Sequence, residues 1–108
     1  MNPFLEEAYG KPQYRREIFN KSFIIWGEDP EEYRRDIYGN IIAFSEYGYR
    51  SDYGWHVDHI HPKSLDGSNL LCNLQPLHWR TNISLGNTTE GKLGWKTYYL
   101  RKWCIEDH

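Results

Sequence analysis

The most constraining feature of the sequence is a series of strand, turn and helix signals within residues 55–86. Residues 55–60 (WHVDHI) alternate large apolar with polar side chains, which is typical of a half-buried strand. Residues 65–68 (LDGS) have turn chemistry, and residues 70–74 are the expected returning strand. Gln75-Pro76 is expected to begin a helix, because proline is tolerated in the first helical turn, and Gly86 suits its end. The segment therefore predicts a strand, a long loop, a second strand and a helix.

The other expected elements are short. Asp29 and Pro30 resemble a capped helix start, and the two acidic residues that follow suit the positive end of a helix, which should stop before Gly39. We also expect helices over residues 5–9 and 14–19, strands over 22–26 and 41–44, and a helix or strand over 92–105. The predicted fold class is therefore α+β.

Length and composition restrict the class of protein. The 108 residues suffice for one domain with one core, and we expect residues 1–108 to form it. Five tryptophans, nine tyrosines and four phenylalanines argue against disorder. No apolar run reaches the roughly 18 residues that a membrane span needs, and the N-terminal residues do not resemble a signal peptide. We therefore expect a cytoplasmic protein without a membrane partner.

Charge and cysteine content narrow the partners further. A formal net charge of −2 argues against a polybasic binder of nucleic acids or membranes. It does not argue against an enzyme whose bound cation meets a phosphate, because that cation supplies the positive charge locally. The only two cysteines, Cys72 and Cys104, cannot form a CxxC zinc knuckle. We expect two reduced thiols, with a disulfide between them as the alternative.

Four polar residues within residues 55–86 are of the types that bind metal ions and transfer protons. Asp58 and His59 lie near the end of the first predicted strand, Asn73 lies in the second and Asn82 lies on the predicted helix. Carboxylate and amide oxygens suit a hard divalent cation such as magnesium. A histidine beside them can take a proton from water near neutral pH. Together these groups offer metal-assisted hydrolysis of a phosphoester.

The stretch YGWHVDHIHPKSLDGSNLLCNLQPLHWRTN resembles the motif of HNH endonucleases, the ββα-metal finger, and the upstream run DIYGNIIAFSEYGYRSDYG resembles a subgroup of that family. The resemblance covers about residues 36–87, the motif core. It implies a ββα-metal core with additional N- and C-terminal elements. It also implies a DNA endonuclease that uses a divalent cation, Mg²⁺ or alternatively Mn²⁺ or another divalent ion, and leaves 5′-phosphate and 3′-hydroxyl ends.

Carried over residue by residue, the resemblance gives each of these side chains a role. Asp58 and Asn82 would be metal ligands, and His59 would be the general base. Asn73 would brace the loop by bonding the backbone that orients His59. Asparagine at the last position makes this the HNN variant. His78 lies four residues before Asn82 on the same helical face, and is a candidate third ligand or an outer group.

Two departures from the family pattern are visible. Many members hold the finger with two CxxC pairs around a structural zinc; neither pair is present here, so we expect no structural zinc and aromatic packing in its place. Many members also carry a lysine three residues after the last motif position, which is Leu85 here. Arg80, Lys63 and Lys92 are the candidates to contact phosphate instead.

Other functions stay open from the sequence. The finger is compatible with a catalytically silent nucleic-acid-binding module, or with a toxin nuclease controlled by an immunity protein. An RNA substrate and a homodimer are also compatible with it.

Overall fold

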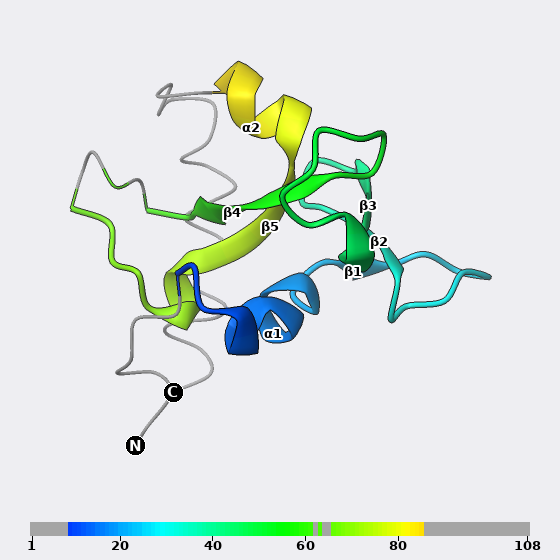
Figure 1. Ribbon diagram of the computed structural model, residues 1–108, viewed down its shortest axis with the longest axis horizontal. Helices are drawn as coiled ribbons and strands as arrows, with labels where there is room; N and C mark the ends of the chain where they lie inside the picture. The colour runs from blue at the N-terminus through cyan, green and yellow to red at the C-terminus, as the bar shows by residue number, and fades with distance from the viewer. Residues whose placement is uncertain (1–8, 62, 64–65, 86–108) are drawn as a thin grey trace.

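The computed structural model describes residues 9–61, 63 and 66–85, and these mix short helices with short strands (Figure 1). The helical elements are η2 (Pro12–Tyr14), α1 (Arg15–Phe19), η3 (Phe44–Glu46), η5 (Leu71–Asn73) and α2 (Trp79–Leu85). The strands are β1 (Phe23–Ile24), β2 (Tyr33–Arg35), β3 (Ile41–Ala43), β4 (Trp55–His59) and β5 (Leu74–His78). The predicted α+β class is confirmed.

The strands form two antiparallel sheets. One has the order β1-β2-β3, and the other is the β4-β5 hairpin. In the hairpin, Asp58 pairs with Gln75 and His59 pairs with Leu74. The helix α2 follows β5 directly and lies against both strands of the hairpin, so the chain order here is β4, β5, α2.

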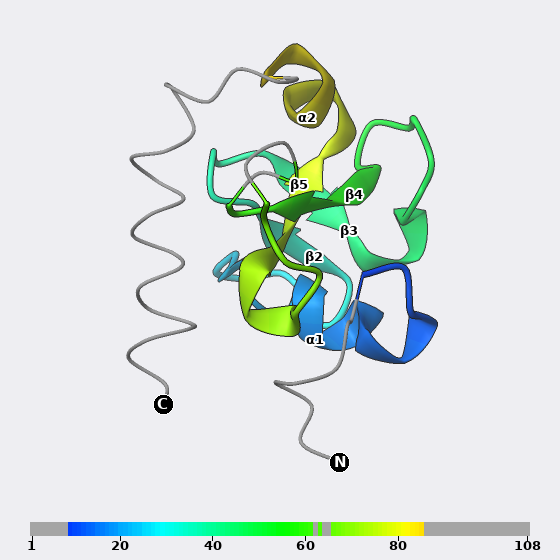
Figure 2. The ribbon, with the colours of Figure 1, turned by 90° about the vertical axis from the view of Figure 1, so that its left-hand side faces the viewer.

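The hydrophobic core lies between α1 and the β4-β5 hairpin. Phe19 and Trp55 are fully buried, and their ring centroids are 5.4 Å apart. The same buried cluster includes Tyr14, Ile18, Ile42, Leu71 and Leu74. Figures 1 and 2 show α1 and α2 on opposite sides of the hairpin. The core therefore supports one side of the hairpin and leaves the other side to α2.

Two expected helices differ from the structure. The Asp29-Pro30 signal ends in a turn, in which Asp29 Oδ1 accepts a bond from the Glu31 amide at 3.0 Å, and the chain then enters β2. Pairing of β2 with strands on both sides outweighs the local helix signal. The second helix begins at Trp79, because residue Pro76 pairs with Val57 inside β5. Proline is tolerated there because, among the described strands, β5 pairs with β4 alone.

The other predictions have mixed outcomes. The strands expected near residues 23, 42 and 57 and the helix ending at Phe19 are confirmed.

Cys72 is disulfide-bonded, so the prediction of reduced thiols is wrong; the spacing of cysteines along a chain does not report their distance in space. Among the described residues no helix is long and apolar enough to cross a membrane. The helix expected over 5–9 lies almost wholly, and the element over 92–105 wholly, outside the described residues.

Candidate functional site

The predicted site residues lie on the hairpin and its following helix. Asp58 and His59 are the last two residues of β4, and Asn82 lies in the middle of α2. Thr81, Asn82 and Leu85 are half-buried, whereas Arg80, Ile83 and Ser84 are exposed. Since α2 packs on β4 and β5, the face that carries Asn82 is the one turned toward the hairpin.

The Asp58 carboxylate is buried and held across the hairpin. Only 5% of the residue is exposed, and Oδ2 accepts a hydrogen bond from Gln75 Nε2 at 2.9 Å. Gln75 is itself 1% exposed. This hydrogen bond fixes the direction in which the other carboxylate oxygen points.

Two orphaned polar atoms belong to the surroundings of Asp58. Within the described part of the chain, Gln75 Oε1 and Tyr38 Oη are buried and have no hydrogen-bond partner. Burial, and then the negative charges of Asp58 and Asp36, raise the pKa of Tyr38 above its ordinary value. Buried polar atoms without partners are uncommon and call for a water or an ion. A buried carboxylate with such neighbours fits a hydrated hard cation, whose ligands are oxygens.

The imidazole ring of His59 has a polar contact at its edge and an aromatic ring against its face. Its Nε2 lies 2.7 Å from Asn69 Oδ1, and the ring of Tyr9 packs against the imidazole with centroids 4.8 Å apart. The surroundings of His59 thus differ from those of Asp58, which bonds Gln75. The sequence alone does not identify Asn69 or Tyr9 as a neighbour of His59, because both come close to His59 only in the folded structure.

Asn73 closes the loop between the two strands of the hairpin. Its Oδ1 accepts a bond from the His61 amide at 2.7 Å, and its Nδ2 donates to the carbonyls of His61 at 3.2 Å and Ser68 at 2.7 Å. The Ile60 amide also donates to the Asn73 carbonyl at 2.8 Å. These bonds fix the backbone immediately after His59.

Asn82 and His78 differ in the hydrogen bonds that their side chains make. Among the described residues the Asn82 side chain takes part in no hydrogen bond, so its amide oxygen is available to a ligand. Both ring nitrogens of His78 are engaged: Nε2 donates to the Asp52 carbonyl at 2.8 Å, and Nδ1 accepts from the Arg80 amide at 3.1 Å. The His78 side chain thus binds backbone groups of Asp52 and Arg80, and we do not include it among the metal ligands.

A structural role emerges for Asp36 and Asn40, to which the sequence reasoning assigned none. Asp36 is 1% exposed, and its Oδ2 accepts the His78 amide at 2.9 Å while Oδ1 accepts the Asn40 amide at 2.9 Å. Asn40 Nδ2 then donates to Thr81 Oγ1 at 2.8 Å. This network ties the β2-β3 turn to the start of α2, and so sets where Asn82 lies relative to β4.

The cationic candidates are less constrained. Arg80 is exposed, with its guanidinium 5.1 Å from the Trp79 ring centroid, and Lys63 is exposed. Lys92 lies outside the described residues. The described residues contain no group of three or more His, Cys, Asp or Glu side chains that could hold a metal ion. Asp58 and Asn82 are not such a group, because they are two residues and one of them is an asparagine.

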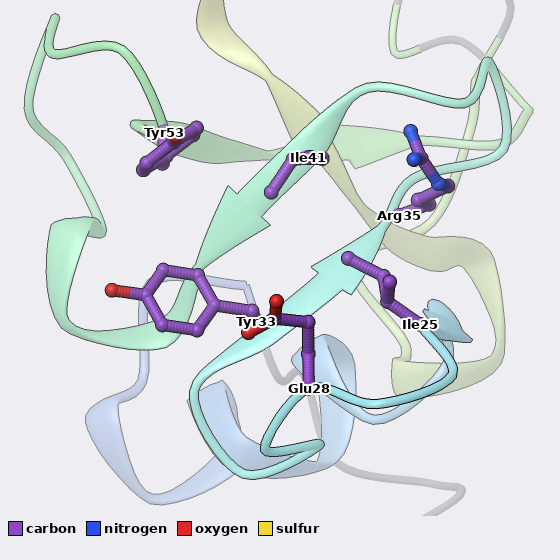
Figure 3. Close-up of a pocket in the computed structure, with 6 residues that line it drawn as sticks. All are labelled: Ile25, Glu28, Tyr33, Arg35, Ile41 and Tyr53. Carbon is purple, nitrogen blue, oxygen red and sulfur yellow. The ribbon is translucent and has the colours of Figure 1, made fainter.

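A separate pocket opens on the three-stranded sheet. It has a volume of about 410 Å³ and is lined by Ile25, Glu28, Tyr33, Arg35, Ile41 and Tyr53 (Figure 3). No predicted site residue lines it. The candidate site is therefore the end of the β4-β5 hairpin with α2, not this pocket.

Comparison with known proteins gives one family match over part of the chain. Residues 44–88 match the family model described as HNH endonuclease, and they include β4, β5 and α2. No curated protein and no solved structure matched the chain. The matched segment is 45 of the 108 residues, and the family it matches is described as endonucleases, enzymes that act on nucleic acid.

Proposed function

Because residues 44–88 carry an HNH endonuclease domain, we propose that the protein is a divalent-metal-dependent DNA endonuclease with its site on β4, β5 and α2. The proposal includes a single domain over residues 1–108, with the motif core at about 36–87, and no structural zinc. The observation that carries it is the buried Asp58 beside His59 at the end of β4, with the Asn82 face of α2 packed on that strand.

In the proposed reaction each side chain has one task. Asp58 and Asn82 would hold one Mg²⁺ or Mn²⁺, which when bound supplies positive charge to the phosphoryl and leaving oxygens. His59 takes a proton from a water molecule, and that water attacks the phosphorus in line with the 3′ oxygen. The phosphorus–oxygen bond to the 3′ oxygen breaks, and that oxygen takes a proton from solvent water, leaving a 5′-phosphate and a 3′-hydroxyl.

The remaining residues position these groups. Gln75 orients the Asp58 carboxylate, and Asn73 holds the backbone next to His59. Arg80, Lys63 and Lys92 are proposed to contact phosphates of the DNA, in place of the lysine that many HNH members carry at the position of Leu85.

A plasmid assay tests the proposal. Supercoiled plasmid is incubated with the protein in Mg²⁺ and in a chelator, with an RNA substrate digested in parallel. We expect nicked DNA in Mg²⁺ only, with ends that DNA ligase reseals because they carry a 5′-phosphate and a 3′-hydroxyl. Retardation of DNA without cutting would replace the proposal with a silent binding module, and cleavage of RNA alone would replace the substrate.

A further inference from the structure

Two arginines from different elements meet at one tryptophan ring. The guanidinium carbon of Arg50, in the loop before β4, is 5.8 Å from the centroid of Trp79, and that of Arg80, on α2, is 5.1 Å from it. Both arginines are exposed, and the tryptophan is half-buried. A cation within about 6 Å of an indole centroid is attracted to the ring. Trp79 therefore gathers two positive charges on one surface.

The loop that carries Arg50 is fastened to the start of α2. The Trp79 indole Nε1 donates to the Ser51 carbonyl at 2.6 Å. His78 Nε2 donates to the Asp52 carbonyl at 2.8 Å. Because these bonds join the backbone immediately after Arg50 to the helix and the residue before it, the fold itself fixes where Arg50 lies relative to α2.

The two guanidinium groups at Trp79 keep their hydrogen-bond donors available. Arg16, Arg34 and Arg35 each donate from the guanidinium to a backbone carbonyl. Among the described residues, the side chains of Arg50 and Arg80 make no hydrogen bond and no ion pair. A guanidinium presents its N–H donors in a planar fork that matches the oxygens of a phosphate. Two such groups on one surface suit a polyanion, the backbone of a nucleic acid.

The arginine pair lies beside the proposed metal site. Asn82 follows Trp79 by three residues, so the two side chains share a face of α2. We propose that Arg50 and Arg80 bind phosphates of the DNA backbone next to the one that is cleaved, and that Trp79 holds both guanidinium groups in place. The inference rests on the proposed function, and it adds Arg50 and Trp79 to the residues that contact or position the substrate.

Single substitutions separate this surface from the charge of the whole chain. Arg50→Gln removes the charge, and Arg50→Lys keeps it. Arg35→Gln is the matched control, because it removes the same charge from another exposed arginine, on β2 in the other sheet. Circular dichroism checks that each variant is folded, and Arg50→Ala replaces Arg50→Gln if the latter does not fold.

The first readout is the salt dependence of binding, which needs no cleavage. The Kd for a labelled DNA duplex is measured by fluorescence anisotropy in chelator, between about 50 and 200 mM salt. Each lost phosphate contact lowers the slope of log Kd against log salt by about 1. We expect that reduction in Arg50→Gln, and about twice that reduction when Arg80→Gln is added. Arg35→Gln and Arg50→Lys should keep the wild-type slope.

The second readout is the cleavage of DNA in Mg²⁺. For Arg50→Gln we expect KM for DNA to rise about 10-fold, the cost of one charge-assisted hydrogen bond. The kcat should stay near wild type, because the lost contact binds the substrate and the transition state alike.

A wild-type salt slope or a wild-type KM in Arg50→Gln would overturn the inference. An equal loss of slope in Arg35→Gln would also overturn it, and so would the absence of duplex binding by wild type at about 50 mM salt. If the wild type binds DNA with the expected slopes but does not cleave it in Mg²⁺, the proposed function fails and the binding surface stands.

Discussion

At the scale of single residues, the state of Asp58 depends on a neighbour across the hairpin. Both Asp58 and Gln75 are buried, and the amide of Gln75 donates to Asp58 Oδ2 at 2.9 Å. Within the described residues, Gln75 Oε1 is buried and has no hydrogen-bond partner. A hydrated cation beside Asp58 would give this atom a partner, which makes Gln75 a sensitive reporter of the proposed metal site.

Replacing Gln75 with leucine should weaken metal binding. Without the donor, the Asp58 carboxylate loses its orientation, and we expect the Kd for Mn²⁺ to rise about 10- to 100-fold, as outer-shell substitutions do. Isothermal titration calorimetry measures this directly. The matched control is Gln13→Leu, the same change at an exposed position of η2. Equal Kd values for the two variants would exclude Gln75 from the metal site.

Tyr38 should make stability fall at alkaline pH. Burial and the charges of Asp58 and Asp36 raise the pKa of Tyr38 above its ordinary value. The folded state thus holds this proton more tightly than the unfolded chain does. Its contribution to the free energy of unfolding is fully present below about pH 10, the pKa of an ordinary tyrosine, and is lost as pH rises through the folded-state pKa.

Urea unfolding of wild type and Tyr38→Phe, near neutral pH and above about pH 10, measures this loss. We expect the wild type to lose more stability than Tyr38→Phe between the two conditions. Tyr49→Phe, at an exposed position, controls for removal of a hydroxyl and should behave like the wild type. A wild type and a Tyr38→Phe variant with the same pH dependence would contradict the account.

At the scale of elements, the sequence predicted the helices and strands that local residue patterns determine. It did not predict those that depend on the pairing of one strand with another. The alternation in residues 55–60 predicted β4, whereas the roles of Asp58, His59, Asn73 and Asn82 stay predictions. The boundary between β5 and α2 was not predictable, because Pro76 suits both a helix start and a strand with one neighbour. Asn69, Gln75 and Asp36 were missed since their roles depend on the loop fold and the strand register.

The joint between β4 and α2 has a strict requirement at Gly54. A Cβ there would lie 1.8 Å from the Tyr49 carbonyl oxygen, and the Gly54 carbonyl accepts the Trp79 amide at the start of α2. Gly54→Ala must therefore move the backbone of the joint.

We expect Gly54→Ala to cost more than about 3 kcal/mol of unfolding free energy, beyond the usual range of single substitutions, measured by urea denaturation. Gly10→Ala is the matched control. It has a positive φ of 79° but no atom within 4 Å of the added Cβ, so only the backbone strain of about 1–2 kcal/mol applies. A Gly54→Ala variant no less stable than Gly10→Ala would show that the joint is not tight.

At the scale of the whole molecule, the net charge of −2 shapes how DNA is bound. The 13 lysines and arginines are outnumbered by 15 aspartates and glutamates, so affinity without a metal should be low, and its contacts to phosphates should make it fall with salt. Fluorescence anisotropy with a labelled duplex in chelator should show binding at about 50 mM salt that is lost by about 200 mM. Addition of Mg²⁺ to the inactive His59→Ala variant should strengthen binding. Affinity that does not change with salt would contradict this.

The most direct test of the central claim is the single-turnover rate of DNA cleavage in Mg²⁺ by wild type, His59→Ala and His61→Ala. His61 is an exposed histidine two residues after His59, so its substitution is the matched control. We expect the rate of His59→Ala to fall at least about 100-fold, the usual contribution of a general base, and that of His61→Ala to stay near wild type. Equal rates for wild type and His59→Ala would contradict the assignment of the site.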